Sequence, residues 1–204
     1  MYKRQLQLVH EATKQRAWTL HHNAKGYLCV LDHITGRTDG LAERFREVTN
    51  FFQKHNDSRA AAVFLNHRGR YLISENVDYA DRCIEDARDM ADTGGHEDLR
   101  HHIELSIIKL RLWKHQRQAH DAPRLAHSEN LRELSAIEAY AGRMGIWSLQ
   151  CDALRLRAEF LLLQGETTTA GKLLIRSMAI CRRSTMRLRL NNALTIYALS
   201  LIHI

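Results

Sequence analysis

The feature that most constrains the fold is a repeat with a period of 40 residues near the end of the chain. Within residues 149–204, Ala153-Leu154 and Ala158 recur as Ala193-Leu194 and Ala198. Gly165 lies between the two copies and is expected to form a tight turn. A period of this length is typical of stacked helical hairpins, in which each repeat buries its apolar face against its neighbours. We therefore expect residues 1–204 to form a single array of hairpins.

The amino-acid composition predicts an all-α protein. The 204 residues include one proline and 10 glycines, too few for the many turns of a sandwich or barrel. Leucine, alanine, arginine and glutamate are abundant, and all are good helix formers. A hydrophobic share of 45% is sufficient for a continuous core.

The apolar spacing predicts nine helices with short turns between them. Their approximate ranges are 13–34, 41–55, 59–74, 77–93, 97–117, 123–141, 146–164, 167–183 and from 186 onward. Residues 1–12 show little pattern. Thr38 or Asp39 is expected to cap the second helix, and Asn76 the fourth. Gly69 suggests a close approach by a neighbouring helix, whereas Gly142 and Gly145 are expected to break the chain between helices.

The last predicted helix is still apolar at Ile204, where the sequence ends. Helical arrays normally end in a helix with a polar outer face. We therefore expect this chain to be a truncated piece of a longer protein.

The arrangement of small and bulky residues resembles the tetratricopeptide repeat, most clearly in residues 147–183. The family's small positions are matched by Ala158, Ala170 and Ser177, and its bulky positions by Leu154, Leu161 and Leu174. The resemblance implies a right-handed α-solenoid of antiparallel helical hairpins. Arg157 departs from the motif, because the family prefers leucine there, and the repeat is longer than the usual 34 residues. Similar long repeats occur in sensor arms of bacterial signal-transduction ATPases and in helical-repeat transcription regulators.

The resemblance also implies a concave groove lined by the first helix of each hairpin. The residues expected to face this groove are Arg100, Ile103, Arg111, Asp152, Arg155, Glu159 and Asn192. Several of them are arginines, which bind carboxylates through paired hydrogen bonds, so we expect an acidic protein or peptide as partner. The expected function is that of a regulatory interaction scaffold in a bacterial protein.

Nucleic-acid binding is the alternative function, since the net charge is +7 and the pI about 9.5. The basic residues gather in two stretches, Lys109–Arg117 and Arg182–Arg189. We interpret both as solvated helix edges and helix ends, where arginine stabilises the last carbonyl groups. No aromatic stacking platform accompanies them.

The remaining residue types predict neither catalysis nor a cofactor. The chain lacks the common nucleophile, phosphate-loop and zinc-protease motifs, so we do not expect an enzyme. Four widely spaced cysteines are interpreted as core residues in a reducing, cytoplasmic environment. Thirteen histidines, including the pairs His21-His22 and His101-His102, do not have the spacing of a metal site. We expect no metal and, because no long apolar run occurs, no membrane contact.

Overall fold

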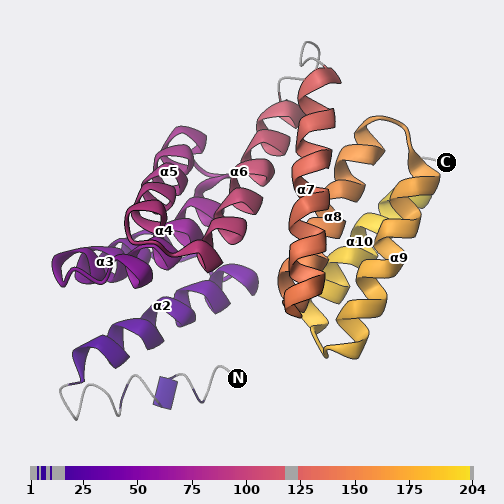
Figure 1. Cartoon of the computed structure of the whole chain (residues 1–204). Helices are drawn as coiled ribbons and strands as arrows, with labels where there is room; N and C mark the ends of the chain where they lie inside the picture. Colours follow the sequence, from indigo (N-terminus) through magenta and orange to yellow (C-terminus); the bar gives the residue numbers. More distant parts are fainter. Residues whose placement is uncertain (1–3, 5, 8–9, 11–16, 118–123, 203–204) are drawn as a thin grey trace. The chain divides into compact units, whose positions relative to one another are not determined.

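The computed structural model describes residues 17–117 and 124–202, together with residues 4, 6, 7 and 10. In this described part the chain is all-helical, without strands, as the composition predicted. Nine helices follow one another (Figure 1). Their bounds are α2 Trp18–Ile34, α3 Leu41–Lys54, α4 Ser58–Leu72, α5 Val77–Thr93, α6 Glu97–Arg117, α7 Arg124–Met144, α8 Trp147–Leu163, α9 Thr167–Arg183 and α10 Arg187–Ile202.

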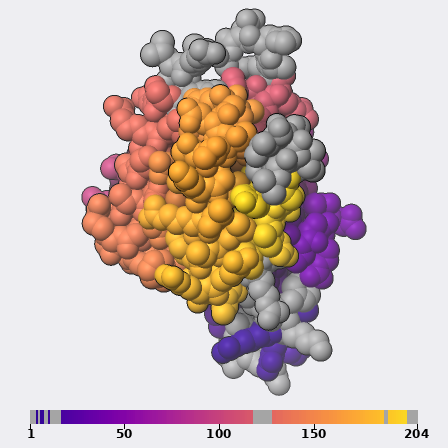
Figure 2. Space-filling model, turned by 90° about the vertical axis from the view of Figure 1, so that its right-hand side faces the viewer, coloured from indigo at the N-terminus to yellow at the C-terminus, as the bar shows by residue number. Residues whose placement is uncertain are grey.

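The chain divides into two compact units, residues 1–110 and 111–204, each described by itself. In the first unit, α2 packs on α3, α3 on α4 and α4 on α5, and α2 also contacts α4. In the second unit, α7 to α10 pack in chain order and α8 also contacts α10. In Figure 2 the orange and yellow surface belongs to these later helices. Contacts between helices two apart are those that stacked hairpins require. The expectation of one continuous domain stays a prediction.

The core of the N-terminal unit is built on the apolar stripe of α3. Leu41, Phe45, Val48 and Phe52 are each 0% exposed, which confirms that their spacing marks one buried helix face. Val48 and Phe52 pack with Phe64 of α4. In the C-terminal unit, Ala158, Ala170 and Leu174 form a buried cluster where α8 crosses α9. Small residues at the crossing let the two helices approach closely.

The predicted cap at Asn76 and the predicted close approach at Gly69 are confirmed. Asn76 accepts a hydrogen bond from the backbone N–H of Tyr79, and Asp57 caps α4 in the same way. Gly69 is a close-approach position, because a Cβ there would lie 2.5 Å from Cγ1 of Ile84. Since a Cβ atom cannot come so near, the contact between α4 and α5 needs glycine.

Two predictions about turns are wrong. Neither Thr38 nor Asp39 caps α3: the cap residue is Gly40, with φ +61°, and no side chain bonds to the helix end. Gly142 does not break the chain, because α7 continues through it to Met144. Gly145, with φ +67°, forms that turn alone. Gly142 is instead a packing position, since a Cβ there would lie 3.1 Å from Nε2 of Gln150.

Candidate functional site

A cavity of about 160 Å³ lies between α4 and α6 in the N-terminal unit. Its α4 side is formed by Ala62, Val63, Asn66, His67 and Arg70, and its α6 side by Leu99, His102 and Ile103. These positions recur every three or four residues, so each helix contributes a single face. The cavity therefore lies between one face of α4 and one face of α6.

The two helices are held together beside the cavity at their N-terminal ends. Arg59 at the start of α4 donates two hydrogen bonds to Asp98 of α6, at 2.7 and 2.5 Å. Ser58 lies 3.0 Å from Nε2 of His96, which precedes α6. These contacts join residues 38 and 39 positions apart in the sequence. They fix the spacing of the two helices and so the width of the cavity.

Asn66 is the unusual residue of the cavity. It is 5% exposed, and its Oδ1 atom has no hydrogen-bond partner in the described part of the chain. Leaving a buried amide oxygen unpaired costs about 1–3 kcal/mol. A buried polar atom without a partner is rare in native proteins and marks a place where a ligand or water can bind.

The charged residues around the cavity are basic. Arg70, His67 and His102 line it, and no acidic side chain is among its lining residues. Arg70 carries a permanent positive charge, and each of the three residues also takes part in an interaction within the chain. Nearby, burial together with the charges of Lys109 and Arg70 lowers the pKa of His33 to about 4.

The low pKa of His33 predicts a pH dependence of stability. Between about pH 6.5 and pH 4 the unfolded chain protonates His33 while the folded chain does not. Stability should therefore fall as the pH falls through this window, by at most about 1.4 kcal/mol per pH unit from this group. The substitution His33→Phe keeps a ring against Tyr71 and should flatten the dependence. Urea unfolding midpoints at pH 7 and pH 4.5 measure it; equal slopes for both proteins would contradict the assignment.

The structure places the predicted groove residues of the N-terminal unit in different environments. Ile103 is 2% exposed and lines the cavity, so it lies in the floor of the site and not on an open surface. Arg100 points elsewhere and pairs with Asp92 at 3.2 Å. Only Ile103 of the predicted set contributes to the cavity. The sequence pattern did not predict the other residues that line the cavity, of which Asn66 is the most unusual.

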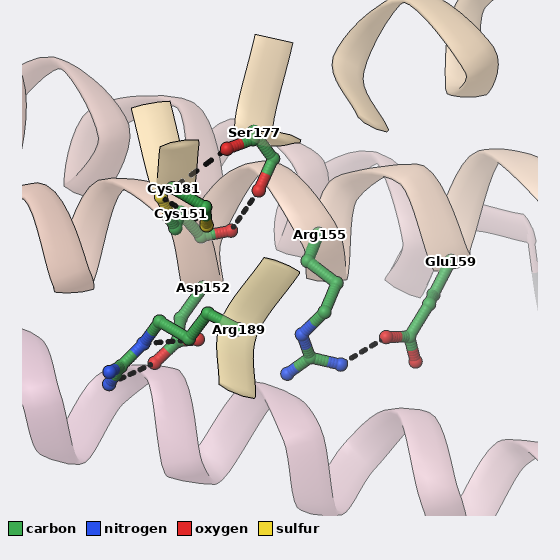
Figure 3. Close-up of polar contacts among 7 residues, drawn as sticks. All are labelled: Cys151, Asp152, Arg155, Glu159, Ser177, Cys181 and Arg189. Carbon is green, nitrogen blue, oxygen red and sulfur yellow. Dashed lines mark hydrogen bonds and ion pairs between the residues drawn. The ribbon is translucent and has the colours of Figure 1, made fainter. Parts of the chain in front are cut away.

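In the C-terminal unit the predicted groove residues are paired with one another or with neighbours (Figure 3). Arg155 pairs with Glu159 one turn further along α8. Asp152 accepts hydrogen bonds from Arg189 of α10 at 3.2 and 3.3 Å. Arg111 contacts Asn130 at 3.0 Å and Glu133 at 3.2 Å. Asn192 is exposed on α10. The charges of Arg155, Asp152 and Arg111 thus already have partners of opposite sign.

The arginines of the basic stretch Arg182–Arg189 also lie in different environments. Arg182 and Arg183 are exposed in the last turn of α9, whereas Arg189 is held by Asp152. In the other stretch, the guanidinium of Arg117 lies 4.1 Å from the ring centre of Trp113. Arginines at a helix end and over an aromatic ring fit the structural interpretation of these stretches.

The cysteines are buried and free, as expected of core residues. Two of them are closer than their sequence spacing suggested, because Sγ of Cys181 lies 3.3 Å from Sγ of Cys151 (Figure 3). Ser177 completes the contact by donating a hydrogen bond to the backbone carbonyl of Cys151. Burial, together with the neighbouring Cys181 thiol, raises the pKa of Cys151 to about 12.

This burial predicts a slow reaction of Cys151 with alkylating reagents. At pH 8 the folded protein should react with iodoacetamide at Cys151 roughly a hundredfold more slowly than the urea-unfolded protein, because little thiolate forms. Cys29, whose pKa burial raises to about 11, should follow the same trend. Timed alkylation followed by peptide mass spectrometry measures both rates. Comparable rates in the folded and unfolded protein would show that α8 and α9 open readily at this contact.

Two further properties concern the described residues only. No three histidine, cysteine, aspartate or glutamate side chains gather closely enough there to hold a metal ion. No helix among those residues is both long enough and apolar enough to cross a membrane. His120, one of the thirteen histidines, lies outside the described residues.

No protein-family model matches the chain, and no curated protein or solved structure is significantly similar to it. The described part of the chain is all-helical, neighbouring helices pack on one another within each unit, and a cavity lies between α4 and α6 in the N-terminal unit.

Proposed function

We propose that the protein is a regulatory interaction scaffold built as a tetratricopeptide-like, right-handed α-solenoid. In this proposal a segment of a partner protein lies against the first helices of the hairpins and inserts a side chain into the cavity between α4 and α6. The cavity is the observation that carries the proposal, because it combines apolar walls with basic rims at a seam between hairpins. The partner is an acidic protein or peptide, and no cofactor is required.

The arrangement of the cavity supports this assignment in two ways. Its position between the first helices of two successive hairpins, α4 and α6, is where arrays of this class bind extended or helical segments. Its basic lining selects against basic partners and favours acidic ones, because opposite charges accelerate and orient association. The absence of an enzyme activity stays a prediction of the sequence.

Nucleic-acid binding is the second candidate, since the chain carries a net charge of +7 and exposed arginines such as Arg182 and Arg183. The two functions differ in their response to salt. Contacts with several phosphates weaken by orders of magnitude between about 50 and 200 mM salt, whereas an apolar anchor does not. Many arginines here are already paired with carboxylates, which leaves fewer charges for phosphates.

The proposal predicts that Arg70→Glu abolishes partner capture. Reversing the charge on the cavity rim should weaken binding of an acidic segment at least tenfold, because an attraction becomes a repulsion. The measurement is affinity capture from a bacterial lysate, with and without nuclease, at two salt concentrations. Arg132→Glu is the matched control, since Arg132 is 81% exposed and is not among the residues that line the cavity.

The outcomes separate the candidates. A protein that is retained in both nuclease lanes, lost with Arg70→Glu and kept with Arg132→Glu supports the scaffold. Capture that disappears with nuclease favours nucleic-acid binding instead. Capture that is the same for both variants contradicts a role of the cavity.

A further inference from the structure

We propose that the cavity between α4 and α6 binds a small organic anion that carries a hydroxyl or N–H group next to its carboxylate, the chemistry of a 2-hydroxy acid. In the function proposed above, a partner side chain enters this same cavity; here the cavity is proposed to bind a free small molecule. This binding does not depend on that function, because it can be measured with the purified protein and a single compound.

The size of the cavity limits the ligand. A cavity of about 160 Å³ is close to the ~150 Å³ of an apolar cavity that holds one benzene molecule. It therefore accommodates about six non-hydrogen atoms. This volume is too small for a nucleotide or a segment of helix but suits one small acid.

The basic residues that line the cavity favour a ligand with a negative charge. Arg70 provides a permanent positive charge, and His67 and His102 add donors on both helices. None of the lining residues is a carboxylate. The guanidinium group binds a carboxylate with two parallel hydrogen bonds, and the apolar side chains of Leu99 and Ile103 suit a short aliphatic body.

Asn66 determines which acid fits best. Its side chain is almost fully buried, and its Oδ1 atom has no partner among the described residues. Rotation about the last side-chain bond of asparagine is soft, so the amide can turn toward a ligand. A simple acid would leave Oδ1 unpaired. An acid with a neighbouring hydroxyl donates the missing hydrogen bond.

The positive field extends beyond the lining residues. Lys109 of α6 and Arg70 of α4 both lie close enough to His33 to disfavour its protonation. Two permanent cations thus act on this part of the N-terminal unit, and a bound anion would offset their repulsion.

The test compares three compounds of almost equal size in titrations of the purified chain followed by amide NMR spectra. Lactate carries both the carboxylate and the hydroxyl, isobutyrate replaces the hydroxyl by a methyl group, and lactamide removes the charge. Lactate is expected to shift the signals of Asn66, His102 and their neighbours. Isobutyrate and lactamide are each expected to bind at least tenfold more weakly.

Variants of the chain provide the second arm. Asn66→Asp keeps the shape but adds a negative charge, and Arg70→Gln removes the positive one; each should reduce lactate binding at least tenfold. The matched controls Asn191→Asp and Arg132→Gln change exposed residues and should leave binding unchanged. Circular dichroism spectra check that each variant is folded.

Three results would overturn the inference. The first is the absence of shifts at the cavity residues with lactate up to about 20 mM. The second is equal binding of isobutyrate, which would remove the role of Asn66. The third is undiminished lactate binding by both folded cavity variants. Since none of these measurements involves a partner protein, a failure here leaves the capture experiment unaffected.

Discussion

Replacing Phe64 with alanine is expected to lower the free energy of unfolding by about 3–5 kcal/mol. Phe64 is 1% exposed and packs against Val48, Phe52 and Ala61 in the core of the N-terminal unit. Its ring stacks on Phe52 with ring centres 5.6 Å apart. The substitution removes this ring and leaves a cavity that the surrounding helices cannot fully close.

Urea unfolding followed by circular dichroism measures this loss. Trp18→Ala is the matched control in the same unit, because Trp18 is a large aromatic residue that is 55% exposed. Its loss is expected to cost less than about 1 kcal/mol. Equal effects of the two substitutions would show that the ring of Phe64 does not organise this core.

Gly26 of α2 provides a second test of the packing around Phe64. A Cβ atom on Gly26 would lie 2.2 Å from Cε1 of Phe64, so Gly26→Ala should destabilise the protein by about 1–3 kcal/mol through overpacking. In the background of Phe64→Ala the space is open, and the same substitution should cost little. The difference between the two costs measures the contact directly.

The helices could be predicted because their apolar spacing is a local property. The stripe of α3 and the limits of α9 depend on residues three and four positions apart, and the structure confirms both. The residue that caps α3 could not be predicted from the sequence pattern. A polar residue near a helix start can cap it only if its backbone takes the right angles, and here Gly40 occupies that position instead.

The cavity depends on residues far apart in the sequence. Asn66 and His102 come together only because α6 packs on α4, and the periodicity of either helix alone does not show this. One signal was nevertheless present: Asn66 and His67 are polar residues next to Phe64 and Leu65 in the middle of α4. A polar residue on a buried helix face needs a partner, and this one points to a site. The contact between Cys151 and Cys181 was missed for the same reason.

Arg157 illustrates what a departure from a motif can mean. It occupies a position where tetratricopeptide repeats prefer leucine, and the structure gives the reason. Arg157 of α8 forms an ion pair with Glu138 of α7, whose side chain is 9% exposed. Arg176 of α9 reaches the other oxygen of Glu138 at 2.6 Å. One carboxylate thus joins three successive helices of the C-terminal unit.

Glu138→Leu is therefore expected to destabilise the C-terminal unit by about 3 kcal/mol. The cost comes from Arg157, which is 24% exposed and would be left with a poorly solvated charge. Arg176 is 55% exposed, so water can replace its lost partner. Urea unfolding measures the effect. The control is Glu129→Leu on the same helix, where an exposed pair with Arg132 should contribute less than about 0.5 kcal/mol.

The double variant Glu138→Leu with Arg157→Leu tests whether the ion pair itself stabilises the protein. The two leucines remove both the carboxylate and the stranded charge. Apolar replacements of buried ion pairs are often neutral or stabilising. The double variant should therefore regain stability to within about 1 kcal/mol of the original protein. A double variant as unstable as Glu138→Leu alone would mean that the link to Arg176, rather than the stranded charge of Arg157, accounts for the loss.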